Sequence, residues 1–446
     1  MLNRRQFLQA GAGLVLTSAL VTTLPARAQA RSAHVVVIGG GVGGATAAKY
    51  LKLANPALRV TIIEANRTYI RPYGSSEVVT GHSDMDDLNV GYDTLKTRYG
   101  IDFVFDRVVG FDPVRKQVRT AGRQSIGYDK LIVSPGISLQ YQAIPGYSEK
   151  VAETRAPSGW IPGAQTALLA RQLKAMRPGG IFVLVAPPTP YRCPPGPYER
   201  AALVTEWMRK HNPSGKVIIL DPKDSFVTDA SMQLGWHRLY GYNIPDDYLK
   251  DMPADVRNNG KPAPIEWIRA KAGGKVKRID ARALNVVTEG GTLRADVLNI
   301  IPPMRAGKLA FDMGLTDASG WCPVDRRSFA SNLHPDVYVI GDASIADAMP
   351  KSGFSANTQA KVTAQAVVDQ LAGREPGEPI WENTCYALAG SEYGLFVADV
   401  FRLKDGKITQ ISGPRYLPLD AAPAKIRLAA AYQQAWLKTF TEDCFA

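Results

Sequence analysis

Apolar and polar positions along the chain twice repeat the order strand, helix, strand and acidic residue. In the first repeat, the apolar run "HVVVI" is followed by a glycine-rich turn, the helical run "ATAAKYL" and the strand "RVTIIE", which ends at Glu64. In the second repeat, "IFVLV" is followed by the helical run "ERAALVTEWMRKH" and the strand "KVIIL", after which comes Asp221. Short apolar strands that alternate with helices indicate a parallel sheet with helices on its faces. The pattern therefore predicts an α/β protein with two nucleotide-binding units.

The glycine turn of the first repeat carries a dinucleotide-binding fingerprint. Gly39, Gly41 and Gly44 fit the pattern G-x-G-x-x-G, and Glu64 follows at the usual distance of about twenty residues. We expect Gly39 to make the tight turn, Gly41 to let a pyrophosphate approach the helix N-terminus, and Gly44 to let helix and strand pack closely. Glu64 is expected to accept hydrogen bonds from a ribose.

The corresponding turn of the second repeat lacks this glycine fingerprint. Its sequence is "PPTPYRCPPGP", with Cys193 among the prolines. Proline has no backbone N–H, so this turn cannot offer a phosphate the usual ring of donors. The second unit is therefore predicted not to bind NAD(P).

Three later segments extend the pattern. The strand in "DVYVIGDASIA" runs into Gly341 and Asp342 and resembles the second flavin-binding signature of two-dinucleotide-domain flavoproteins, in which the aspartate holds a ribityl hydroxyl. A simple strand-ending turn is the alternative. Residues 128–137, "YDKLIVSPGI", resemble the segment by which such chains cross between domains. Beyond residue 380, "YGLFVADVFRLKDGKITQIS" predicts two strands around an Asp-Gly turn, and "AKIRLAAAYQQAWLKTF" predicts a helix.

These segments predict an α/β fold with two Rossmann-like domains, of the glutathione-reductase-like kind, and a small α+β C-terminal domain. We expect residues 31–150 and 281–379 to form an FAD-binding domain, residues 151–280 the second Rossmann-like domain, and residues 380–446 a C-terminal interface domain. Residues 243–264 are polar and proline-rich, which predicts a surface excursion of the second domain.

Residues 1–30 have the features of a twin-arginine signal peptide. Arg4 and Arg5 precede the apolar stretch "AGAGLVLTSALVTTL", and "ARAQA" then offers small-x-small cleavage sites. We expect export to the periplasm by the twin-arginine route, with an uncleaved anchor as the alternative. No later segment of the sequence is long and apolar enough to span a bilayer.

Composition narrows the class of protein further. The chain has 446 residues, of which 45% are hydrophobic and 21% charged, as in ordinary globular proteins. Its net charge of +12 fits an anionic substrate, an acidic partner or mere solubility. The basic residues are scattered, which argues against nucleic acid. There is no C-x-x-C-H haem motif and no zinc-type cluster, so no metal site is predicted. Four cysteines could pair in an oxidising compartment, in any of three ways: Cys193, Cys322, Cys385 and Cys444.

Several distinctive stretches resemble the flavoprotein subunit of flavocytochrome c sulfide dehydrogenase. They include "APPTPYRCPPGPYERA", "GWCPVD", "VIGDASIADAMPKSGFSAN" and "NTCYALA". The similarity covers nearly all of the chain after the first thirty residues. The resemblance implies an exported FAD enzyme that oxidises sulfide and passes electrons to a c-type cytochrome.

The resemblance also implies catalytic roles for particular residues. Cys193 and Cys385 match the two cysteines that form a redox-active disulfide beside the flavin in the family. Glu199 is a candidate proton carrier. Arg192 and Lys351 are candidates to favour a thiolate or the charge of reduced flavin. For these three charged residues an ordinary surface ion pair is the alternative.

Other matched positions concern how the flavin is held. Trp436 matches an aromatic residue that covers the flavin, with a core tryptophan as the alternative. Pro72 stands where the family commonly has the cysteine that attaches FAD covalently, so FAD is predicted to be non-covalent. Cys322 matches a family position without an assigned redox role. Cys444 is predicted to be free or paired with Cys322.

The predicted function is that of a periplasmic FAD-dependent sulfide or polysulfide dehydrogenase, whose acceptor is a c-type cytochrome subunit or soluble cytochrome c. Two alternatives stay open at the level of sequence. One is an FAD oxidoreductase with another thiol or reduced sulfur donor, or with a quinone-linked activity. The other is a non-catalytic electron-transfer flavoprotein subunit that docks a cytochrome.

Overall fold

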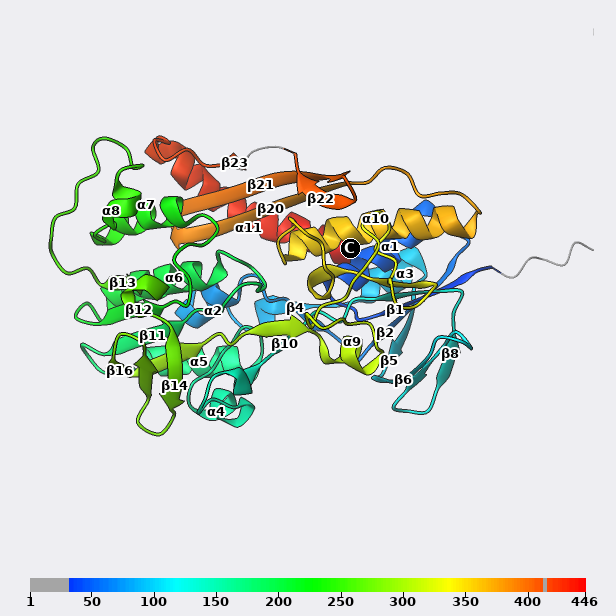
Figure 1. Ribbon diagram of the computed structural model, residues 1–446, viewed down its shortest axis with the longest axis horizontal. Coiled ribbons are helices and arrows are strands. Elements are labelled where there is room, and N and C mark those ends of the chain that lie inside the picture. The colour runs from blue at the N-terminus through cyan, green and yellow to red at the C-terminus, as the bar shows by residue number, and fades with distance from the viewer. Residues whose placement is uncertain (1–31, 412–414) are drawn as a thin grey trace, which may run out of the picture. The chain divides into compact units, whose positions relative to one another are not determined.

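A computed structural model describes residues 32–411 and 415–446 of the chain, and their arrangement is drawn in Figure 1. The predicted signal peptide, residues 1–30, lies outside the described residues. Among the residues that are described, no helix has the length and apolar character needed to cross a membrane. Residues 33–446 form one compact unit.

The first nucleotide-binding unit is built on a five-stranded parallel sheet. The strand order is β19-β9-β1-β2-β5, and every neighbouring pair is parallel. Its strands are β1 (His34–Ile38), β2 (Arg59–Glu64), β5 (Asp102–Phe105), β9 (Lys130–Val133) and β19 (Val337–Val339). All five residues of β1 are buried, because helices and loops cover both faces of the sheet. Helix α1 (Val42–Ala54) connects β1 to β2 and packs against the long helix α10 (Gly353–Leu371).

The second nucleotide-binding unit contains a four-stranded parallel sheet with the order β13-β12-β11-β17. Its strands are β11 (Ile181–Val185), β12 (Lys216–Leu220), β13 (Ile265–Ile268) and β17 (Val297–Ile300). Helix α6 (Gly196–His211) joins β11 to β12. The α/β class with Rossmann-like domains is thus confirmed.

One predicted domain boundary is wrong. The sequence placed the return to the FAD-binding domain at residue 281, yet β17 belongs to the second sheet and pairs with β11. The antiparallel strands before it, β14 (Val276–Asp280), β15 (Asn285–Thr288) and β16 (Thr292–Arg294), also precede the crossover. The chain returns to the FAD-binding domain at β18 (Met304–Ala306). This strand pairs with β10 (Ile137–Leu139), by which the chain left that domain. A short apolar run such as "VLNI" does not show from its sequence which sheet it joins.

A long antiparallel hairpin forms most of the C-terminal domain. Strands β20 (Ile380–Gly390) and β21 (Tyr393–Lys404) pair along almost their whole length. The predicted Asp-Gly turn joins β21 to β22 (Lys407–Gln410), and Asp405 and Gly406 both have positive φ, as a two-residue hairpin turn requires. Strand β20 packs on α6 of the second unit and on α10 of the first. The hairpin therefore brings its side chains to the place where the two units meet.

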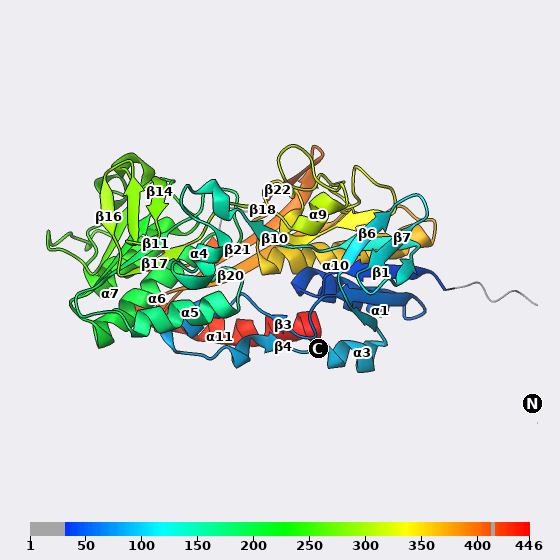
Figure 2. The same ribbon diagram turned by 90° about the horizontal axis from the view of Figure 1, so that it is seen from below.

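The predicted C-terminal helix is α11 (Pro423–Phe445), and it is longer than the sequence pattern indicated. In Figure 2 the red helix α11 runs beside the short strands β3 (Tyr69–Ile70) and β4 (Asn89–Val90). Stacking of Phe445 on Tyr69, with ring centroids 5.3 Å apart, fixes its end to the FAD-binding unit.

The other elements are β6 (Val108–Asp112), β7 (Gln117–Thr120), β8 (Ser125–Gly127), β23 (Arg415–Tyr416), α2 (Ser75–Thr80), α3 (Asp93–Tyr99), α4 (Glu149–Thr154), α5 (Ala164–Lys174), α7 (Asp229–Tyr240), α8 (Asp246–Leu249), α9 (Lys308–Asp312) and the 3-10 turns Asp86–Leu88, Tyr141–Ala143, Ala270–Ala272 and Gly341–Ala343.

Residues 243–264 are less of a free excursion than their composition predicted. Ile244 is 1% exposed, and Met252 and Val256 are also buried in the main hydrophobic core. Three isolated apolar side chains therefore fix a polar segment to the second unit.

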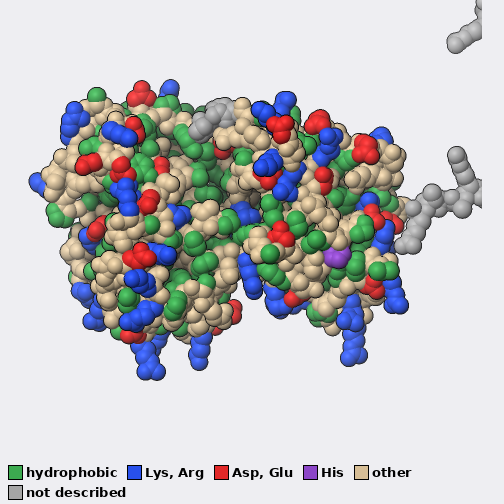
Figure 3. Space-filling model, in the orientation of Figure 1, with side chains coloured by type: hydrophobic (Ala, Val, Ile, Leu, Met, Phe, Trp, Pro, Cys, Tyr) green, Lys and Arg blue, Asp and Glu red, His purple; other side chains and the backbone are tan. Residues whose placement is uncertain are grey.

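Lys and Arg side chains are spread over the face drawn in Figure 3, among acidic ones, and do not gather there into a single basic patch.

Candidate functional site

The first glycine turn has the close contacts that a dinucleotide cradle needs. Gly39 has φ +96°, and a Cβ atom on it would lie 2.4 Å from the Ser134 carbonyl oxygen. A Cβ on Gly44 would lie 1.8 Å from the Gly39 carbonyl oxygen, so only glycine allows α1 to pack this closely on β1. A Cβ atom on Gly41 would lie 3.3 Å from the nearest atom, which belongs to the Tyr69 ring. Glu64 lies beside the turn, where its Oε2 accepts a hydrogen bond from the Gly40 N–H at 2.7 Å.

Asp342 follows β19 and lies on the short turn after Gly341, which has φ +77°. Its Oδ1 is buried and has no hydrogen-bond partner among the described residues. Burial raises the pKa of Asp342, while Arg192 and Lys351 lower it. A buried carboxylate oxygen without a donor is costly unless a ligand supplies one. Asp342 therefore fits the predicted role toward a ribityl hydroxyl, and with the glycine cradle it makes these residues suitable for FAD.

Lys351 lies beneath the same turn. Its ammonium group donates to the carbonyl oxygens of Asp342 at 2.7 Å and Ser344 at 3.0 Å, and it lies 3.7 Å from the centre of the Trp321 ring. Burial lowers the pKa of Lys351 to about 8. The lysine thus brings a positive charge to the back of the Asp342 turn and is not a surface ion pair.

The two predicted redox cysteines meet at one short segment, residues 351–352. The backbone N–H of Cys193 donates to the Lys351 carbonyl oxygen at 2.8 Å. The thiol of Cys385, on β20, contacts Asn383 Oδ1 at 3.5 Å, and Ser352 Oγ donates to that same oxygen at 2.6 Å. Residues separated by nearly two hundred positions in the sequence are therefore neighbours in the fold.

Both cysteines are partly buried free thiols in this structure. Burial raises the pKa of Cys193, the negative charges of Cys385 and Glu199 raise it further, and Arg192 lowers it. Burial likewise raises the pKa of Cys385 to about 11. Cys193 also has φ +58°, a left-handed conformation that is uncommon for a side chain with a Cβ and is frequent at functional sites.

Glu199 lies in the first turn of α6, close to the cysteines. Its Oε1 accepts a hydrogen bond from the Leu388 N–H at 2.9 Å. Burial, and then the charge of Glu77, raise the pKa of Glu199 to about 8. A carboxyl group with such a pKa changes its protonation near neutral pH, which suits a proton carrier.

Trp436 belongs to a cluster of aromatic rings between α11 and β20. It stacks on Phe440 with ring centroids 4.9 Å apart and lies 6.1 Å from the ring of Tyr386, the residue after Cys385. Its indole N–H is buried without a partner among the described residues. The tryptophan is therefore packed against the strand that carries Cys385, among other aromatic side chains.

The other two cysteines lie in separate, fully buried positions. Cys322 is 0% exposed, and its backbone N–H donates to the Ala343 carbonyl oxygen. Cys444 is also 0% exposed and contacts Asn357 Nδ2 at 3.4 Å. Both are free thiols. The described residues contain no cluster of histidine, cysteine and carboxylate side chains suited to a metal ion.

The acidic residue of the second unit is occupied by the protein itself. Asp221 is 0% exposed and accepts hydrogen bonds from the Tyr198 hydroxyl, the Trp267 indole N–H and the Lys223 ammonium. In a nucleotide-binding unit this acid would be available to a ribose. The acid of the second unit is thus already hydrogen-bonded by the protein's own side chains.

We expect NADH to reduce the flavin of the holoenzyme far more slowly than sulfide does, because the proline-rich turn lacks backbone N–H donors for a phosphate and Asp221 is already hydrogen-bonded. Anaerobic stopped-flow absorbance with each donor in turn measures this. Rapid reduction by NADH would show that the proline turn does accept a pyridine nucleotide.

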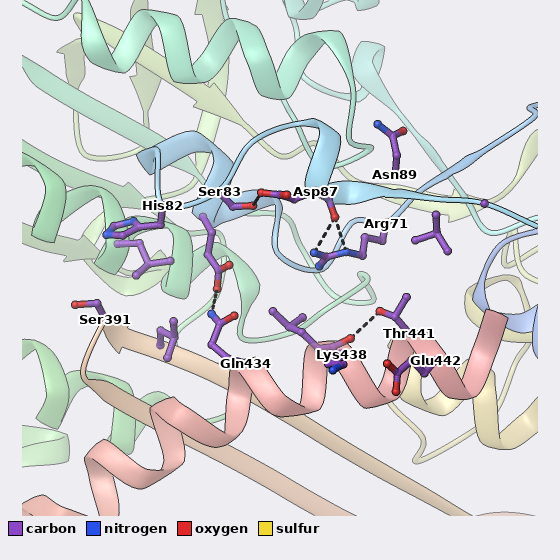
Figure 4. Close-up of a pocket in the computed structure, with 16 residues that line it drawn as sticks. Arg71, His82, Ser83, Asp87, Asn89, Ser391, Gln434, Lys438, Thr441 and Glu442 are labelled. Atoms are coloured by element: carbon purple, nitrogen blue, oxygen red, sulfur yellow. Dashed lines mark hydrogen bonds between the residues drawn. The ribbon is translucent and has the colours of Figure 1, made fainter. Parts of the chain in front are cut away.

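A cavity of about 770 Å³ lies next to Glu199, since Leu388, which binds Glu199, is one of its lining residues. Figure 4 shows its walls: Arg71, Ser83 and Asp87 come from the segment around α2, and Gln434, Lys438 and Thr441 face them from α11. Ser391, in the turn after β20, lies at one side. The sequence did not indicate this cavity, because its walls come from segments more than three hundred residues apart. Ser352 and Asn383 were also missed, because their role depends on the hydrogen bond between them, which joins a loop to β20 and which no motif marks.

The fold, the glycine cradle and the Asp342 turn define a two-dinucleotide-domain flavoprotein. Three comparisons with known families agree: residues 33–158 match "Pyridine nucleotide-disulphide oxidoreductase", residues 166–302 match "Sulfide dehydrogenase [flavocytochrome c] flavoprotein chain, central", and residues 377–445 match "Flavocytochrome c sulphide dehydrogenase, flavin-binding". Together the matches support a protein of the flavocytochrome c sulfide dehydrogenase flavoprotein type.

Individual relatives extend this result. The chain is 47% identical over 37 residues to a sulfide dehydrogenase [flavocytochrome c] flavoprotein chain of Chlorobaculum thiosulfatiphilum, a match of 8% of this chain and 77% of that one. It is 27% identical over 316 residues to the mitochondrial sulfide:quinone oxidoreductase of Mus musculus, which covers 70% of this chain and 65% of the relative. The solved sulfide:quinone oxidoreductase of Aquifex aeolicus superposes with a TM-score of 0.69 at 18% identity and covers 92% of both chains. This last likeness confirms the fold.

Proposed function

We propose that this chain oxidises sulfide or polysulfide with a Cys193–Cys385 pair and a bound, non-covalent FAD, and passes the electrons to a c-type cytochrome. The observation that carries the proposal is the meeting of the two cysteines at residues 351–352, directly next to the Asp342 turn. The matches to the flavocytochrome c family support both the donor and the cytochrome acceptor.

The sulfur chemistry begins with the cysteines joined as a disulfide. Hydrosulfide attacks one sulfur, which forms a new S–S bond, breaks the bond between the cysteines and releases the other cysteine as a thiolate. The charge of minus one passes from hydrosulfide to that thiolate. FAD, when bound, accepts the electron pair that sulfide gives up.

The protein's own side chains prepare this step. The proline-rich loop fixes the backbone of Cys193, and its N–H is tied to Lys351. Arg192 counteracts the burial that disfavours a Cys193 thiolate. Glu199 lies close enough to both sulfurs to influence their pKa values and can take the proton that hydrosulfide loses.

The electron acceptor distinguishes this proposal from its nearest alternative. Several relatives are named as sulfide:quinone oxidoreductases, so a quinone is the second candidate acceptor. The test is anaerobic reduction of the holoenzyme by one equivalent of sulfide, followed by mixing with either a c-type cytochrome or a short-chain quinone. Faster reoxidation by the cytochrome supports the proposal, and reoxidation by the quinone alone refutes it. A flavin that sulfide does not reduce, although it accepts electrons from dithionite, would favour the non-catalytic electron-transfer subunit.

Denaturation in acid is expected to release all of the FAD into solution, because Pro72 replaces the usual attachment cysteine and the other cysteines lie elsewhere in the chain. Absorbance of the supernatant and of the precipitated polypeptide measures the partition. Flavin that stays on the polypeptide would show a covalent link at a different residue.

We also propose that the chain acts in the periplasm, because residues 1–30 have the features of a twin-arginine signal. Replacement of Arg4 and Arg5 by lysine should leave the protein in the cytoplasm, which cell fractionation would detect.

A further inference from the structure

Glu77 connects the cavity beside the site with Glu199. Glu77 lies on α2 and lines the cavity, as does Leu388 on β20. The backbone N–H of Leu388 is the group that binds Glu199. Leu388 of β20 therefore both lines the cavity and binds the Glu199 carboxyl group.

Helices α2 and α6, which carry Glu77 and Glu199, pack against each other. Arg200 Nε lies 3.4 Å from Ser76 Oγ, and each of these residues is the immediate neighbour of one of the two glutamates. Arg200 is 1% exposed and also donates to the carbonyl oxygens of Ser158 and Gly159, so it holds α6 rigidly in this position. In agreement with this packing, Glu77 is the largest electrostatic cause, after burial, of the raised pKa of Glu199.

Two glutamines of α11 hold Glu77 from the other side. Gln434 Nε2 donates to Glu77 Oε1 at 3.0 Å, and Gln433 Nε2 donates to the same oxygen at 3.2 Å. Gln433 is 6% exposed, and its Oε1 is buried without a partner among the described residues. A buried amide oxygen next to a carboxylate and a cavity is suited to accept a hydrogen bond from water or from a protonated carboxyl group.

Sulfide oxidation must release a proton from this buried place. Hydrosulfide gives sulfur, one proton and two electrons, and burial disfavours charge at both cysteines. Glu199 is only partly exposed, so a proton on it needs a route to water.

We propose that Glu77 is a second proton carrier of the sulfide reaction, which takes protons from Glu199 and passes them to water in the cavity between α2 and α11. This inference rests on the proposed function. The charged and titratable groups that face Glu199 are Glu77, Arg200, Cys193 and Cys385, and those that line the cavity around Glu77 are Arg71, His82, Asp87, Lys438 and Glu442.

The test compares Glu77→Gln with Glu442→Gln in the holoenzyme. Glu442 lines the same cavity with an exposed side chain, so its replacement removes the same charge without touching Glu199. Stopped-flow reduction by sulfide is followed across pH 5 to 10. We expect Glu77→Gln to slow flavin reduction by sulfide roughly tenfold. In the plot of this rate against pH, the apparent pKa due to Glu199 should fall by about one pH unit, because the substitution removes a negative neighbour. Glu442→Gln should keep the wild-type rate and profile.

Small weak acids provide a readout that a structural defect would not change. Imidazole or formate, added at increasing concentration, should restore the rate of Glu77→Gln, because they can carry protons through the cavity, and should not restore Glu199→Gln. Glu77→Asp should retain part of the rate. If Glu77→Gln keeps the wild-type rate and pH profile, or if the added acids have no effect on it, the proposal is overturned.

An infrared titration separates this proposal from the function on which it rests. The oxidised holoenzyme should show the band of a protonated carboxyl group that disappears near pH 8, is absent in Glu199→Gln and disappears at lower pH in Glu77→Gln. This measurement needs no sulfide. If the band of Glu77→Gln disappears at the same pH as that of the wild type, the coupling of the two glutamates is refuted, even when sulfide reduces the flavin. If the band disappears at lower pH but sulfide does not reduce the flavin, only the proposed function is refuted.

Discussion

Replacement of Cys193 by serine should lower the rate of flavin reduction by sulfide roughly 10³-fold or more, because the nucleophilic exchange at the cysteine pair has no substitute in the site. Cys193 is the only cysteine of the proline-rich turn. Its N–H donates to Lys351, whose neighbour Ser352 shares the Asn383 side chain with Cys385. Serine keeps the size of the side chain and can occupy the same backbone conformation. Stopped-flow absorbance under anaerobic conditions gives the rate directly.

Two further variants make this result interpretable. Cys385→Ser should give the same loss, since a pair is required. Cys322→Ser removes a buried thiol elsewhere and should leave the rate of reduction by sulfide nearly unchanged. All three proteins should retain FAD and accept electrons from dithionite. If sulfide reduces the flavin of Cys193→Ser at an undiminished rate, the proposed disulfide chemistry is wrong.

Replacement of Asp342 by alanine should weaken FAD binding about 10- to 100-fold, the effect of losing one hydrogen bond to a charged, buried group, or about 1.5–3 kcal/mol. Asp342 Oδ1 is buried and has no partner among the described residues, so it is available to accept a hydrogen bond from the cofactor. The dissociation constant is measured by titrating the apoprotein with FAD and following the quenching of flavin fluorescence.

The same substitution should not destabilise the apoprotein. Burial raises the pKa of Asp342, so the folded apoprotein carries a penalty for the charged form at neutral pH. That penalty disappears as the pH falls below the ordinary carboxyl value of 3.8, so the melting temperatures of the two apoproteins should differ most near pH 7. Asp312→Ala, on the exposed face of α9, is the matched control for loss of one charge. Unchanged FAD affinity, or an apoprotein less stable than the wild type, would contradict this account of Asp342.

Local signals in the sequence predicted most of the fold. The order of strand, helix, strand and acid predicted both nucleotide-binding units. The glycine turn marked the first unit only, because a Cβ atom on Gly39 or Gly44 would lie 2.4 or 1.8 Å from a backbone oxygen. The Asp-Gly turn at residues 405–406 was predictable for a similar reason, since both residues adopt positive φ.

Features that depend on distant partners were not predictable in this way. The boundary at residue 280 was wrong because β17 is defined by its pairing with β11, more than one hundred residues earlier. Strand β20 was not recognised, since "WENTCYALAG" alternates poorly and is stabilised by β21, α6 and α10. Isolated apolar residues such as Ile244 and Met252 fix a polar segment that composition alone indicated to be a surface excursion.

The candidate site shows the same division. Single residues, such as Cys193, Asp342 and Glu199, were identified from motifs and from family resemblance. Their setting was not, because Glu199 is bound by the Leu388 N–H on β20, and Asn383, which contacts Cys385, is held by Ser352 from another part of the chain. The cavity needs α2 and α11 together, and no spacing in the sequence relates them.

Peptide mass spectrometry of the oxidised holoenzyme, before and after one equivalent of sulfide, tests the central claim most directly. We predict a disulfide-linked pair of peptides that contain Cys193 and Cys385, and its conversion by sulfide into separate peptides, one of which has gained a single sulfur atom. Flavin that is reduced by sulfide in a protein where these two cysteines are never linked and never gain sulfur would contradict the account.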